Sequence, residues 1–102
     1  MGNRLKLQAK LEEVLGSKNV YFQPPESKKL VYDCIVYKRS DIWNRHADDK
    51  NYMITDGYEV TAIYKNPDRL IAKDILEAFQ YSRFQWHFTS DGLNHDVLTL
   101  YY

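Results

Sequence analysis

Apolar residues recur at helical spacing close to the start of the chain. They are Leu7, Leu11, Val14 and Leu15, and mostly polar residues fill the positions between them. Asn3 is suited to cap the start of such a helix, and Gly16 to follow its last turn. The pattern predicts an amphipathic helix over residues 3–15.

Two extended segments follow. Residues 20–22 favour a strand, and Pro24-Pro25 ends it because proline cannot donate to a sheet ladder. Residues 30–38 carry apolar side chains on both sides of an alternating pattern, which is typical of a strand in the middle of a sheet. Cys34 lies within that strand, and we expect a small buried residue there and not a nucleophile.

Mixed charges interrupt the pattern between residues 39 and 55. We interpret this segment as a long, ordered connection anchored by scattered aromatic and aliphatic residues. Asp56-Gly57 predicts a turn at its end. From residue 58 to residue 65, apolar and more polar side chains alternate, which predicts a strand with one buried face.

A second helix is predicted after that strand. Asn66 suits a helix N-cap and Pro67 the first helical position. Apolar residues at helical spacing then continue to about Ala78 or Phe79.

The last part of the chain reads as a hairpin. Phe84, Trp86 and Phe88 alternate with more polar residues, which indicates a strand with its aromatic side chains on one face. Asp91-Gly92 is a hairpin turn signal, and residues 95–102 supply the returning strand.

The predicted fold class is α+β, with an antiparallel or mixed sheet of four to five strands and two helices packed on one face. The 102 residues predict one domain spanning 1–102. A core of this size leaves a small stability margin unless a partner covers more apolar surface.

Charge and composition narrow the classes of function. Lys plus Arg and Asp plus Glu each total 14, so no long-range field attracts the molecule to nucleic acid or to anionic lipid. The single cysteine cannot form an internal disulfide, and no apolar run approaches the length of a membrane span. We therefore expect a protein of the reducing cytoplasm, with no membrane and no sequence-specific nucleic acid among its partners.

Candidate catalytic or metal-binding residues are few. His46, Asp48 and Asp49 are close together in the sequence, and His87 and His95 are placed to face each other across the predicted hairpin. None of them lies in an HExxH motif or beside a paired cysteine element, so a solvated charged loop and exposed strand histidines explain them. We expect no catalytic residue, no metal and no cofactor.

The surfaces are more informative. The last predicted strand carries apolar groups on both faces, whereas a small domain has one core face to fill, and the nine tyrosines suit contacts between proteins. Loops folded back over the second face would explain the same pattern. The candidate contact residues with other subunits or partners are Trp43, Tyr52, Met53, Tyr101 and Tyr102.

Three stretches, residues 15–26, 30–37 and 88–102, resemble small tail-completion or tail-terminator proteins of siphophages. The resemblance implies a virion protein made in the host cytoplasm that forms a hexameric ring on the head-proximal end of the tail tube. It implies as partners other copies of the chain, the major tail tube protein and the head-side connector or stopper protein. We expect the ring to close through head-to-tail contacts between subunits.

Two other classes remain open from the residues alone. A small nucleic-acid-binding or regulatory module is suggested by the Lys28-Lys29 and Lys38-Arg39 pairs, although the zero net charge argues against it. A metal-dependent hydrolase would have to draw its ligands from His46, Asp48, His87 and His95.

Overall fold

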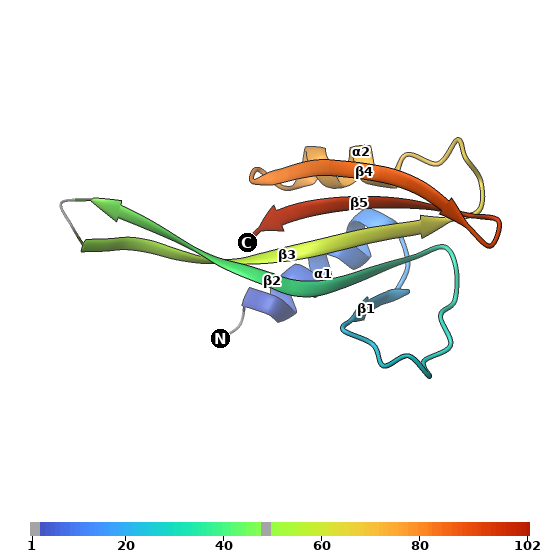
Figure 1. Cartoon of the computed structure of the whole chain (residues 1–102), viewed down its shortest axis with the longest axis horizontal. Helices are drawn as coiled ribbons and strands as arrows, with labels where there is room; N and C mark the ends of the chain where they lie inside the picture. Colours follow the sequence, from blue (N-terminus) through green and yellow to red (C-terminus); the bar gives the residue numbers. More distant parts are fainter. Residues whose placement is uncertain (1–2, 48–49) are drawn as a thin grey trace.

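The fold is one mixed sheet with its helices on one side. The computed structural model describes the backbone of residues 3–47 and 50–102 and the side chains of residues 4–40 and 56–102. Within these ranges the elements are α1 (Asn3–Leu15), β1 (Val20–Phe22), β2 (Cys34–Ala47), β3 (Lys50–Tyr64), α2 (Ile71–Ala78), β4 (Ser82–Ser90) and β5 (Leu93–Tyr101). The strand order is β1-β2-β3-β5-β4, and only the β1–β2 pair is parallel. Both helices lie behind the sheet in Figure 1, which confirms the predicted α+β class.

The hydrophobic core lies between the helices and the sheet. Both helices contribute residues at a spacing of four, which face the sheet as one stripe. The strands contribute alternate residues from one face. The main buried members are Leu7, Leu11, Leu15, Ile71, Ile75, Ile35, Tyr37, Tyr58, Val60, Leu98 and Leu100.

Elements specified by local signals form as predicted. Helix α1 has the predicted bounds, and Gly16 ends it with a φ of 83°, where its N–H donates to the Glu12 carbonyl (2.8 Å). Asp91 and Gly92, with φ of 53° and 76°, make the turn between β4 and β5. Strand β1 also matches its predicted residues.

The long connection predicted over residues 39–55 is wrong. These residues form the outer parts of β2 and β3, whose antiparallel pairing continues to Ala47 and Lys50. In Figure 1 this ribbon projects beyond the other strands. Asp56-Gly57 is likewise not a turn, because Gly57 lies inside β3 and pairs with Asp41 next to a shift in register at Ser40.

Helix α2 begins later than predicted, at Ile71 and not at Pro67. Asn66 forms a turn instead of a helix cap, because its side-chain oxygen accepts from the Asp68 N–H (2.9 Å) and its carbonyl accepts from the Arg69 N–H (3.0 Å). The predicted end is confirmed, since the last helical residue is Ala78.

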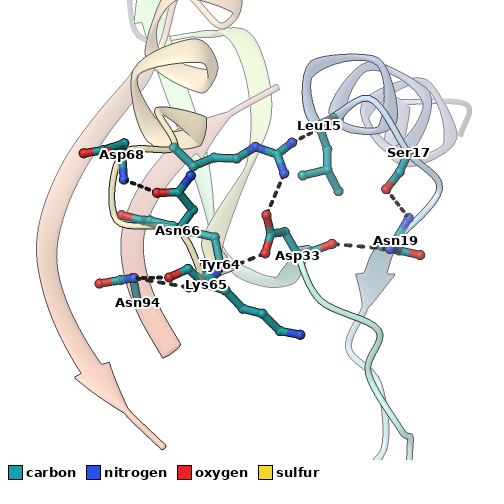
Figure 2. Close-up of polar contacts among 10 residues, drawn as sticks. Leu15, Ser17, Asn19, Asp33, Tyr64, Lys65, Asn66, Asp68 and Asn94 are labelled. Atoms are coloured by element: carbon teal, nitrogen blue, oxygen red, sulfur yellow. Dashed lines mark hydrogen bonds and ion pairs between the residues drawn. The ribbon is translucent and has the colours of Figure 1, made fainter. Parts of the chain in front are cut away.

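Strand β2 also begins later than predicted, because polar contacts hold the chain around Asp33 outside the ladder (Figure 2). One Asp33 carboxylate oxygen accepts from the Lys65 N–H (3.0 Å), and the other pairs with the Arg69 guanidinium (2.6 Å). Arg69 also donates to the Leu15 carbonyl at the end of α1 (2.9 Å). Three segments that are distant in the sequence are therefore joined at this point.

A bulge in β4 changes the predicted placement of the aromatic residues. Phe84 pairs with Leu98, but Trp86 pairs with the adjacent residue Val97, so Gln85 is the extra residue. Phe84 therefore faces the helix side of the sheet, while Trp86 and Phe88 face the other side. The period-two pattern that placed all three on one face is wrong here, because a bulge reverses the alternation.

Candidate functional site

We call the side of the sheet opposite the helices the open face. The strand registers place paired residues in rows that cross the open face from β1 to β4. One row is Tyr21, Val36, Thr61, Val97 and Trp86. The next is Cys34, Ile63, His95 and Phe88.

The open face is apolar at its centre. Cys34, Ile63 and Val97 are buried although they lie outside the helix-side core. Trp86 and Phe88 remain exposed, at 52% and 41% of their surface. Large exposed aromatic side chains beside a buried apolar centre are typical of a protein contact surface.

Phe88 and His95 form a stacked pair on the open face. Their ring centroids lie 4.5 Å apart with 12° between the planes. The stack favours one orientation of each ring before any partner is present. This preference lowers the conformational entropy that these two side chains would lose when a partner binds.

A polar row borders the apolar centre. Lys38 and Glu59 form an exposed ion pair (3.5 Å), and Arg83 lies at the β4 end of the row with no ion-pair partner among the described side chains. Next to Arg83 is an open depression of about 560 Å³. Its lining residues are Gln80, Tyr81, Ser82, Arg83, Gln85, Thr99 and Tyr101. A cation beside tyrosines suits a carboxylate from a protein partner.

Of the five predicted contact residues, Tyr101 lies in the best position for contact. It lines the depression on the open face. Tyr102 instead packs against the core, where its ring lies 5.8 Å from that of Phe79. Removing the last two residues would therefore test stability as well as contact.

The other three predicted contact residues belong to the β2–β3 ribbon. Trp43 is opposite Thr55 and Met53 is opposite Arg45, and Tyr52 is in β3 beside the second register shift. Their side chains lie outside the described residues. The structure therefore describes no side-chain contact for these three residues.

His87 and His95 do not face each other as predicted. His87 is opposite Asp96 and His95 is opposite Phe88, so the two rings point to opposite faces of the sheet. No group of His, Cys, Asp and Glu residues suited to a metal ion occurs among the described residues. The side chain of His46 and the whole of Asp48 and Asp49 lie outside the described residues.

Asp96 holds a polar chain on the helix side of the sheet that the sequence did not indicate. Its buried carboxylate accepts from the Tyr64 hydroxyl (2.7 Å) and pairs with His87 Nδ1 (2.6 Å). Burial, together with the Asp96 carboxylate, raises the pKa of Tyr64 to about 12. Both carboxylate oxygens are thereby satisfied, which explains how Asp96 is tolerated there.

The chain matches no protein-family model, no curated protein and no solved structure. Among the described residues, no helix is both long enough and apolar enough to cross a bilayer.

Proposed function

We propose that this chain is a virion assembly protein that caps the head-proximal end of a siphophage tail tube as a ring. In that role it would end tube growth and provide the surface to which the head connector or stopper binds. The observation that carries the proposal is the open face, where Trp86 and Phe88 remain exposed above buried Ile63 and Val97 after the core has been filled on the other side.

The sequence resemblance gives this surface its proposed partners, which are neighbouring copies, the major tail tube protein and the head-side protein. A ring protein needs contact surface on at least two sides of each subunit, because each copy meets a different patch of its neighbour. The open face and the projecting β2–β3 ribbon supply two separate surfaces (Figure 1).

Deletion of the gene in a phage or prophage that carries it tests the proposal. Electron microscopy of the resulting particles should show filled heads separate from tails, or tails longer than normal. Joined virions with tails of normal length would contradict it.

Complementation then tests the surface. We expect Trp86→Ser to restore few joined virions and Leu5→Ser to restore them fully, because Leu5 is at least as exposed as Trp86 but lies on α1. The melting temperature of each purified variant shows whether the fold is retained. Equal rescue by the two variants would remove the open face from the proposal.

A further inference from the structure

Strand β4 is an exposed edge of the sheet with aromatic residues on both faces. Phe84, on the helix side, is 45% exposed, and Trp86, on the open face, is 52% exposed. A partner lying only on the open face would cover Trp86 and leave Phe84 in water. A strand added alongside β4 would contact both, since its side chains alternate between the two faces.

The backbone of β4 also has unused hydrogen-bonding groups. The Tyr101 N–H donates to the Tyr81 carbonyl (2.8 Å). Because hydrogen-bonded and non-hydrogen-bonded pairs alternate in an antiparallel ladder, this bond determines which β4 residues direct their backbone groups toward β5. By alternation and the register after the bulge, the backbone groups of Phe84, His87 and Thr89 point away from β5. Natural sheets usually protect such an edge with charges or proline, but Arg83 is the only Lys, Arg, Asp, Glu or Pro residue in β4.

The opposite side of the same sheet has a second unpaired edge. Strand β1 pairs with β2 only from Ile35 to Tyr37, and the Gln23 side chain accepts from the Arg39 N–H (3.1 Å). Beyond that point no described strand lies on the outer side of β2 at residues 41–47. A two-stranded ribbon is marginally stable alone, so a third strand would stabilise it.

We propose that β4 of one copy pairs with the outer part of β2 of a second copy, which joins the two sheets head to tail. The two edges are on opposite sides of one sheet, so each copy accepts one neighbour and donates to another. This contact rests on the proposed function, for which it supplies the subunit interface. It also covers Phe84 and Trp86 together.

Proline scanning of the edge tests the backbone pairing. Thr89→Pro removes an N–H that points outward and no hydrogen bond to β5, so the fold should remain. We expect purified wild type to form oligomers at high concentration in sedimentation velocity, Thr89→Pro to be monomeric, and the control Thr89→Ala to behave as wild type. A monomeric wild type at every concentration, or Thr89→Pro oligomers equal to those of wild type, would overturn the proposal.

Cysteine cross-linking identifies the occupant of the edge. Thr89→Cys and Asn44→Cys proteins are mixed and treated with a flexible bismaleimide; Cys34 is buried, and wild type alone serves as the control for it. We expect covalent dimers mainly in the mixture. Cross-linking of Thr89→Cys with itself would show that two β4 strands pair, and oligomers without cross-links would show another contact. Either result would overturn the proposed pairing.

The two proposals fail in different ways. If Thr89→Pro abolishes oligomers but gene deletion leaves normal virions, the edge pairing holds and the tail function is wrong. If deletion separates heads from tails but Thr89→Pro complements fully and oligomerises, the tail function holds and the edge pairing is wrong.

Discussion

The rings of Tyr37 and Tyr58 lie 5.9 Å apart in one core, yet their hydroxyl groups have opposite environments. The Tyr37 hydroxyl donates to Gln8 Oε1 (2.6 Å) and accepts from Arg4 (3.1 Å). The buried Tyr58 hydroxyl has no partner within hydrogen-bond distance among the described residues, and the Arg39 guanidinium lies over its ring, 5.8 Å from the centroid. Neighbouring β2 and β3 positions thus differ in how much their polar atoms contribute to stability.

Phenylalanine substitutions should separate these two tyrosines. We expect Tyr37→Phe to lower the free energy of unfolding by about 1 kcal/mol, because Gln8 and Arg4 lose their partner. Tyr58→Phe should be neutral or slightly stabilising, since it removes a buried polar atom without a partner. Urea unfolding of the three proteins measures both effects, and a larger loss for Tyr58→Phe would contradict this assignment.

Arg69 should contribute more to stability than an ordinary surface charge. Its guanidinium donates both to the Asp33 carboxylate and to the Leu15 carbonyl at the end of α1, and the single ammonium group of a lysine lacks the planar, forked donor geometry that binds both acceptors. We expect Arg69→Lys to cost about 1 kcal/mol after allowance for its partial exposure. Lys38→Gln, which breaks the exposed pair with Glu59, is the matched control and should cost less than about 0.5 kcal/mol. Equal losses of melting temperature for the two variants would show that the Arg69 contacts contribute no more to stability than an exposed ion pair.

Stability should fall in alkali partly through Cys34. Burial, and to a lesser degree the Asp33 charge, raises the pKa of its thiol to about 11. Since the folded pKa lies above the unfolded value, this contribution is complete below about pH 9 and is lost as the pH rises through about 11. Cys34→Ala should flatten the fall in unfolding free energy between these values. An unchanged slope would contradict the raised pKa.

Asp96 and Tyr64 should be coupled. Asp96→Ala leaves the Tyr64 hydroxyl buried without its acceptor and should cost about 1–3 kcal/mol. The double variant with Tyr64→Phe should cost less than the sum of the two single changes, because the unpaired hydroxyl is then gone. Additive losses in urea unfolding would show that the two residues do not interact.

Part of this fold could be predicted because its signals are local. Helix α1 has its apolar stripe and its terminal Gly16 within a few turns of one another, and the β4–β5 turn has Asp91-Gly92. The sequence pattern also correctly predicted the burial of Cys34 in a central strand and the apolar side chains on both faces of β5. Each of these depends on neighbours in sequence or on strand alternation, which the chain displays directly.

Other features depended on contacts between distant segments. Residues 39–55 have no clear period of their own, and pairing of each half with the other decides that they are strands. The start of α2 depends on Asn66 forming a turn and on Arg69 reaching Asp33 and Leu15.

The location of the candidate contact surface depended most strongly on the tertiary structure. Its aromatic residues could be identified in the sequence, but the bulge at Gln85 places Phe84 on one face of the sheet and Trp86 on the other. Composition and periodicity therefore determined that apolar surface would be left over. Only the register of β4 against β5 determined where it lies, because one extra residue exchanges the two faces of a strand and nothing local marks it.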